Sequence, residues 1–88
     1  NLSALNVKAK GSKLNVFEIT GVRRQSVADK AGVEEGGIIV SINGISAKSI
    51  NLNVINALFN FKPGKKINLI VDRKGQRMRK EFRLEDQI

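Results

Sequence analysis

Apolar residues fall on alternate positions near the start of the chain, on the odd numbers of residues 5–9. This period of two predicts a short half-buried strand, which a turn at Gly11 ends. A second strand of β-favouring residues is predicted over 14–22, but its parity slips after Ile19. Because Gly21 stands at the slip, we expect a β-bulge there.

Residues 26–33 have the signals of a very short helix at both ends. Ser26 can cap the N-terminus, and Asp29 follows three residues later in a relation like a capping box. Gly32 suits a left-handed terminator, and Val33 can fold back onto the last turn. A helix this short is not stable alone, so its apolar residues must rest on a core.

The middle of the chain predicts a central strand, a hairpin turn and a second helix. Residues 38–42 are apolar on both faces, which favours a strand covered on both sides, and Asn43-Gly44 is a strong two-residue hairpin signal. Asn51 or Asn53 can cap a helix that ends at Lys62-Pro63-Gly64. Its apolar arc consists of Leu52, Val54, Ile55, Leu58, Phe59 and Phe61.

Two more alternating segments complete the pattern. Residues 67–71 predict a strand, residues 73–75 a turn, and a final strand follows. The inner row of that strand contains Met78, Phe82 and Leu84, interrupted only by Lys80. The count is five or six strands and two helices, so we expect a small α+β domain on a mostly antiparallel sheet.

Composition restricts the chemistry of this domain. A chain of 88 residues supports one hydrophobic core, so we expect residues 1–88 to form a single domain. It contains no His and no Cys, which excludes His-dependent nucleophile systems, Cys/His metal sites and disulfides. The few aspartates are not paired, so we expect no catalytic residues, no metal site and no cofactor. No apolar stretch approaches the length of a membrane span. Since the chain begins at Asn1 without Met, we expect it to be a piece of a longer protein.

Two adjoining segments resemble a known family. The first runs from Phe17 through Ser26-Val27-Ala28, Ala31-Gly32-Val33 and Gly36-Gly37 to Ile39, and the second is Ser41-Ile42-Asn43-Gly44. Together they are similar to the middle of bacterial PDZ domains, and the later helix and strands continue the match over nearly the whole chain. The resemblance implies a partly open antiparallel β-barrel in the permuted bacterial topology, in which the C-terminal strand replaces an N-terminal one.

The helix end around Leu58-Phe59, the turn at Pro63-Gly64 and a closing strand that reaches Leu84 and Ile88 point to a narrower resemblance. They are similar to the PDZ module that follows the catalytic domain of Bacteroidetes retropepsin-like aspartic proteases. The resemblance implies a non-catalytic regulatory module of a larger protease, in the periplasm, in the cell envelope or secreted. Its implied partners are peptides or protein C-termini, or the catalytic domain of the same chain.

The PDZ resemblance also implies a ligand site. A PDZ domain adds an extended peptide to a strand edge and receives its terminal carboxylate in a turn of backbone N–H groups. The matching carboxylate-binding loop is Leu2, Ser3, Ala4 and Leu5. The matching peptide groove consists of Leu5, Asn6, Val7, Asn51, Leu52, Ile55 and Leu58. Simple core packing is the alternative interpretation of Leu5, Val7, Ile55 and Leu58.

The sequence departs from the family pattern at several of these positions. Ser3 and Ala4 replace residues in a turn that is usually rich in glycine, which leaves carboxylate capture open. Val27 replaces the usual Pro at the helix start. No His is available at the entrance of the second helix, so we expect a ligand with an apolar last residue.

The net charge of +8 raises a different possibility. Six basic residues fall within residues 73–83, and three of them, Arg77, Arg79 and Arg83, share one face of the last strand. This face is a solvated surface, a docking surface for an acidic partner or for the parent's catalytic domain, or a nucleic-acid site. Single-strand binding normally needs stacking aromatics, and only Phe61 lies outside the predicted core. We therefore expect no nucleic-acid partner, and a basic β-rich domain that binds nucleic acid or another anionic surface is the alternative function.

Overall fold

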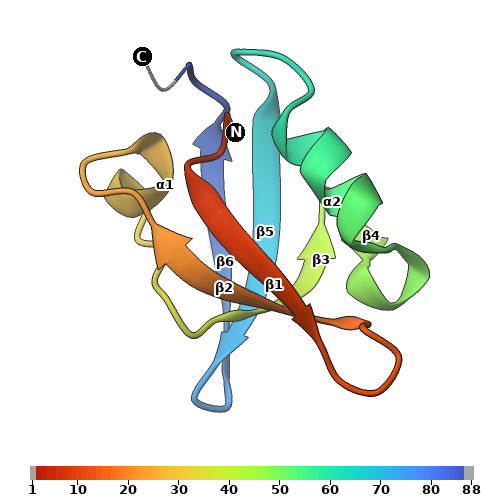
Figure 1. The fold of residues 1–88 in the computed structure, drawn as a ribbon. Helices are drawn as coiled ribbons and strands as arrows, with labels where there is room; N and C mark the ends of the chain where they lie inside the picture. Colours follow the sequence, from red (N-terminus) through yellow and green to blue (C-terminus); the bar gives the residue numbers. More distant parts are fainter. Residues whose placement is uncertain (1, 87–88) are drawn as a thin grey trace.

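The computed structural model describes residues 2–86, in which pairs of strands are separated by two helices (Figure 1). The elements are β1 (Leu5–Lys10), β2 (Val16–Val22), α1 (Val27–Lys30), β3 (Ile38–Ile42), β4 (Ile45–Ser46), a 3-10 turn (Ala47–Ser49), α2 (Leu52–Phe59), β5 (Lys66–Arg73) and β6 (Gln76–Arg83). This is the predicted α+β architecture.

The strands form one antiparallel sheet in the order β1-β2-β3-β5-β6, with β4 paired to β3. The doubly apolar strand β3 is central, as predicted, and β1 and β6 are the two end strands. In Figure 1, β1 (red) crosses in front of β5 and β6, and α2 (green) stands at one side of them. The curved sheet is the partly open barrel that the family resemblance implied.

The predicted bulge lies between β1 and β2. Asn6 is opposite Gly21 and Val7 is opposite Ile19, so Thr20 is the extra residue. The Thr20 hydroxyl donates a hydrogen bond of 3.3 Å to the Asn6 carbonyl. A Cβ on Gly21 would lie 2.9 Å from Nδ2 of the Asn6 side chain, so a larger residue at this bulge would require the exposed Asn6 side chain to move.

Both helices begin at the expected caps. The Ser26 hydroxyl accepts a hydrogen bond of 3.1 Å from the Asp29 N–H, and Gly32 ends α1 with a φ of +89°. The Asp29 carboxylate accepts from the Gln25 N–H at 2.8 Å, one residue earlier than a capping box requires. Of the two candidate caps of α2, Asn51 is the one used, and its Oδ1 accepts from the Val54 N–H at 3.0 Å.

The core joins the inner faces of the strands to one side of each helix. Its largest fully buried side chains include Phe17, Phe59, Leu5, Ile19, Ile42, Ile55, Ile67, Leu69 and Leu84.

Three boundary predictions were wrong. The second strand begins at Val16, because the Leu14 N–H closes a turn onto the Gly11 carbonyl at 3.1 Å. The second helix ends at Phe59, so Phe61 lies beyond it, and Val54 and Phe61 are exposed and do not extend the core. The last strand ends at Arg83, and the part of that prediction that reached Ile88 lies outside the described residues.

Candidate functional site

The outer edge of β1 carries backbone groups that are directed away from the sheet. Within residues 2–86, β2 is the only strand that pairs with β1. The Ile19 N–H donates to the Gly37 carbonyl and the Ile19 carbonyl accepts from the Gly36 N–H, both at 2.8 Å. Ile19 therefore uses both backbone groups on its β3 side. Its partner Val7 must then direct its own N–H and C=O away from β2, and Ala9 does the same by alternation.

The side chains of β1 alternate as the sequence predicted. Leu5 is wholly buried, Val7 and Ala9 are half-buried, and Asn6 and Lys8 are exposed. Leu5 belongs to the hydrophobic core, so it can only form the base of a groove. Val7 and Ala9 are the apolar side chains of this strand that retain partial exposure next to the outward backbone groups.

The turn before β1 keeps a left-handed backbone without a glycine. Ala4 has a φ of +62°, a conformation that costs an L-residue about 1–2 kcal/mol and that glycine adopts freely. Ser3 is completely buried, and its Oγ accepts a hydrogen bond of 3.1 Å from the Leu5 N–H. The missing glycines therefore have not abolished the turn, and one of its N–H groups is bound to a side chain of the turn itself.

Hydrogen bonds of its own backbone groups hold this turn against three other segments. The Leu2 N–H donates to Oδ1 of Asn60 at 3.3 Å, next to the end of α2. The Leu2 carbonyl accepts from the Glu85 N–H at 3.0 Å, and the Ala4 carbonyl accepts from the Arg23 N–H at 3.0 Å. The turn thus lies where α2, β2 and the segment after β6 meet.

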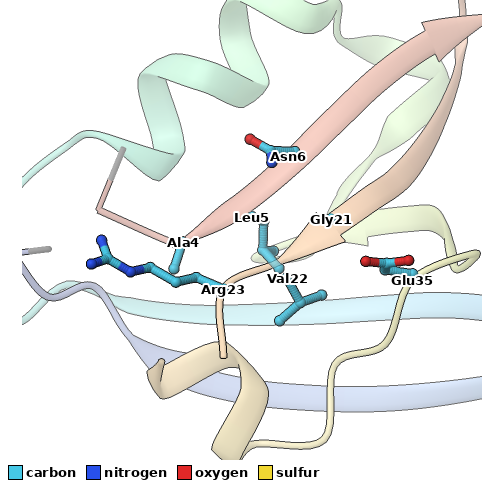
Figure 2. Close-up of a pocket in the computed structure, with 7 residues that line it drawn as sticks. All are labelled: Ala4, Leu5, Asn6, Gly21, Val22, Arg23 and Glu35. Carbon is cyan, nitrogen blue, oxygen red and sulfur yellow. The ribbon is translucent and has the colours of Figure 1, made fainter. Parts of the chain in front are cut away.

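A hollow of about 390 Å³ adjoins the turn and the bulge (Figure 2). Its lining residues are Ala4, Leu5, Asn6, Gly21, Val22, Arg23 and Glu35. Figure 2 shows the Arg23 side chain beside Ala4, with Glu35 at the opposite end of the hollow. The sequence identified Arg23 only as loop charge, because the pairing that brings it to the turn depends on the fold.

The helix α2 presents its predicted groove residues in different directions. Ile55 is completely buried in the core, and Leu52 is half-buried against it. Asn51 uses its side chain as the helix cap. Leu58 lies in a separate hollow with residues of β4 and β5 and none of β1; that hollow is lined by Asn43, Ile45, Leu58, Phe61, Lys65 and Ile67.

Leu58 and the turn before β1 have different neighbours. Leu58 lines its hollow together with Ile45 and Ile67, and no residue of β1 or of the turn lines that hollow. Asn60, which follows the last helical residue Phe59, accepts from Leu2 of the turn. A role of Leu58 in the β1 groove stays a prediction.

The flank of α2 that leads to Asn60 also contains Asn56, which sequence reasoning missed. Leu52 and Asn56 are four residues apart within α2, which places them on one side of the helix, and Asn60 follows the helix end. Asn60 also donates from Nδ2 to the Asn56 carbonyl at 2.8 Å. The spacing of four was the available signal in the sequence. Asn56 and Asn60 are polar, however, and the groove prediction followed the apolar residues of the helix.

The basic face of β6 is exposed, and several of its members bind groups of the domain itself. Arg79 donates to Oδ1 of Asn68 and Arg83 to the Gly64 carbonyl, each at 2.9 Å. Lys66 pairs with Glu81 at 2.9 Å. A hydrogen bond from Lys66, opposed by some desolvation and aided by the charges of Lys66, Arg79 and Arg83, lowers the pKa of Glu81. Part of the predicted stripe is therefore engaged within the domain.

Two expected features can be compared with the described residues. No helix among residues 2–86 is long and apolar enough to cross a membrane. The same residues contain no group of three or more acidic side chains placed to hold a metal ion.

Comparison with known proteins identifies the family. A family profile described as PDZ domain matches residues 18–73. The chain belongs to the PDZ domain family. A probable CtpA-like serine protease of Staphylococcus saprophyticus is 36% identical over 64 residues, which cover 73% of this chain and 13% of that protein.

Solved structures give the same family fold. The HtrA-type protease AlgW with a decapeptide is 25% identical with a TM-score of 0.76, covering 94% of this chain and 28% of that one. The PDZ domain of EpsC from Vibrio cholerae, 18% identical, has a TM-score of 0.67 and covers 94% and 97%. This PDZ chain thus spans only 13% and 28% of the two protease relatives. The expected link to retropepsin-like aspartic proteases finds no support here, since the relative of 36% identity is a probable serine protease.

Proposed function

We propose that this PDZ domain binds extended peptide segments by adding them as a strand to the outer edge of β1. The observation that carries the proposal is the outward direction of the Val7 backbone groups, which follows from the two hydrogen bonds of Ile19 to Gly36 and Gly37. Main-chain hydrogen bonds at such an edge give affinity without requiring one peptide sequence. The structure of AlgW with a decapeptide supports a peptide as the ligand class.

The direction of β1 determines how the peptide lies. The turn at Ser3-Ala4 precedes β1, so a peptide antiparallel to β1 ends beside that turn. Its backbone pairs with Val7 and Ala9, and alternate side chains face α2 at Leu52 and Asn56. The half-buried Val7 and Leu52 lie farther from that turn and favour apolar side chains upstream of the last residue, and the absence of His favours an apolar last residue.

The terminal carboxylate is received at the turn, where the left-handed Ala4 and the cationic Arg23 lie together (Figure 2). Arg23 supplies a positive charge beside a site built otherwise from backbone N–H groups. Charge-assisted hydrogen bonds of this kind are stronger than neutral ones. A free C-terminus is therefore preferred over an amidated one.

We propose that residues 1–88 are a non-catalytic regulatory module of a larger protease. The relatives favour a serine protease as the parent, and an aspartic protease remains the alternative from the sequence resemblance. The periplasm, the cell envelope or the exterior is the proposed location. Docking on the parent's catalytic domain is the second way in which the same β1 edge can act.

A peptide titration tests the proposal. The isotope-labelled chain is titrated with a peptide library ending in apolar residues, each as the free acid and as the amide. We expect amide shifts confined to residues 2–9, Arg23 and residues 51–60, with tighter binding of the free acid. Arg23→Gln, matched by Arg24→Gln, should remove most of the preference for the free acid.

The opposite outcomes are distinct. Shifts elsewhere, or none with any peptide, would contradict peptide addition at β1. Retention on nucleic acid that weakens steeply with salt would instead favour the basic-domain alternative.

A further inference from the structure

The flank of α2 that faces away from the β1 turn carries an exposed apolar hollow of about 210 Å³. Apolar side chains dominate its walls: Ile45 of β4, Leu58 of α2, Phe61 after α2 and Ile67 of β5. Phe61 is 63% exposed and Ile45 is 41% exposed, whereas Ile67 is fully buried at the base. Contiguous apolar patches rimmed by polar residues mark interaction sites, whereas single exposed apolar side chains do not, and here Ile45 and Phe61 line one hollow.

Lys65 lines this hollow, and Lys62 lies beside its Phe61 wall. The Nζ atoms of Lys62 and Lys65 lie 5.8 and 5.9 Å from the centroid of the Phe61 ring. Neither lysine forms an ion pair with an acidic side chain of residues 2–86, whereas the next lysine, Lys66, pairs with Glu81 at 2.9 Å. The charges of Lys62 and Lys65 therefore add to an apolar surface that has no acidic group to balance them.

We propose that this hollow is a second docking site, which binds an acidic segment of another protein chain through one large apolar side chain. The apolar side chain enters between Ile45, Leu58 and Phe61, and carboxylates on either side of it bind Lys62 and Lys65. A peptide backbone need not pair with a strand here, so the segment need not present a free C-terminus. This site is independent of the proposed β1 groove, since no residue of β1 lines it.

Charge and shape favour this occupant over two others. A second copy of the chain carries the same net charge of +8 and would place like charges together. A nucleic-acid base would find one aromatic face at Phe61, but the aliphatic walls of Ile45, Leu58 and Ile67 offer its polar edge no hydrogen-bond partner. An acidic peptide with an aliphatic or aromatic side chain matches both the rim and the walls.

A peptide capped at both ends isolates this site from the β1 groove. The probe is an acetylated and amidated eight-residue peptide of Glu and Asp with a central Leu-Phe pair, titrated into the isotope-labelled 88-residue chain. We expect amide shifts at residues 43–45 and 58–67 and no amide shifts at residues 5–9. The affinity should fall as the salt concentration increases. The same peptide with Lys for each acid, or with Ser-Gly in the centre, should not bind.

Matched variants assign the effect to individual side chains. Lys65→Glu should weaken binding by about tenfold, because an attraction becomes a repulsion, while Lys13→Glu makes the same change of net charge far from the hollow and should leave it within about twofold. Phe61→Ala should reduce binding to a similar extent without loss of fold, since the side chain is exposed. Equal effects of Lys65→Glu and Lys13→Glu would overturn the proposal, as would shifts that map to β1. Tighter binding of a single-stranded oligonucleotide than of the acidic peptide at this surface, or self-association that Phe61→Ala abolishes, would also overturn it.

Discussion

The amide N–H of Leu5 donates a hydrogen bond of 3.1 Å to the hydroxyl of Ser3, and Ser3 is completely buried. Ser3 stands in a turn that is usually rich in glycine in the family. Its hydroxyl therefore competes with a ligand carboxylate for a backbone donor of the same turn. Carboxylate binding at this turn therefore depends on whether the ligand can displace the Ser3 hydroxyl from the Leu5 N–H, and substitutions can test this directly.

Ser3→Ala should lower stability and improve carboxylate capture together. Loss of the buried acceptor should reduce the free energy of unfolding by about 1–2 kcal/mol, measured by urea denaturation. Removing the competitor of the Leu5 N–H should tighten free-acid peptides while amidated peptides change little. Ser49→Ala, at an exposed position, is the control and should alter neither quantity. Equal effects on both peptide forms would argue against a role of this N–H in carboxylate binding.

Ala4→Gly should stabilise the domain. Ala4 has a φ of +62°, and relief of the left-handed strain should raise the free energy of unfolding by about 1 kcal/mol. Ala9→Gly, near the end of β1, makes the same chemical change at an extended residue and should lower the free energy of unfolding by about 0.5–1 kcal/mol. Urea denaturation of the two variants side by side checks the sign. A loss of stability for both would show that the Ala4 turn is not strained.

Asn51→Ala should destabilise the helix that borders the proposed groove. The variant removes the acceptor of the Val54 N–H at 3.0 Å, which should lower the free energy of unfolding by about 1 kcal/mol. Asn53→Ala, two residues later on an exposed face, should be neutral or slightly stabilising because Ala favours helix. Thermal unfolding of the pair distinguishes a cap from a general preference for Asn. Identical losses in the two variants would contradict the assigned cap.

The Glu81–Lys66 pair should contribute to the acid limb of stability. The pKa of Glu81 is lowered, chiefly by its hydrogen bond from Lys66, so the contribution is present above the unfolded pKa of about 4.3 and is lost as the pH falls through the folded pKa. Melting temperatures from pH 6 to pH 3 should separate wild type from Glu81→Gln at the upper end and converge at the lower. Lys66→Gln should reproduce this loss, and the double variant should add little. A constant gap at every pH would contradict the assignment.

Much of the fold follows from local signals. The parity slip at Gly21, the Ser26 cap and the apolar pattern of β3 each depend on neighbours in sequence, and the structure confirms all three. The second strand and the second helix were extended too far, because Leu14 and Phe61 are apolar residues that a turn and a helix end leave in solvent. Apolar character alone does not distinguish a core residue from an exposed one at an element boundary.

The candidate site was less predictable than the fold. Its strand and its turn could be located through the family pattern, but the direction of the Val7 backbone follows from contacts of Ile19 with Gly36 and Gly37, which are distant in sequence. Arg23 and Asn60 lie at the turn because they form hydrogen bonds with Ala4 and Leu2, which are distant from them in sequence. Leu58 was predicted to line the groove from the family resemblance, and it lines a different hollow together with Ile45 and Ile67.

Amide hydrogen exchange along β1, with and without a saturating free-acid peptide, tests strand addition most directly. Val7 and Ala9 direct their N–H groups away from β2, so these amides should exchange fast in the free domain. When the peptide binds, their exchange should slow by about tenfold or more, the effect of roughly one hydrogen bond for each amide. The backbone N–H groups of Lys8 and Lys10 point toward β2 and should be protected in both states, which provides an internal control in the same strand. Unchanged exchange of Val7 and Ala9 at saturation would contradict peptide addition at the edge of β1.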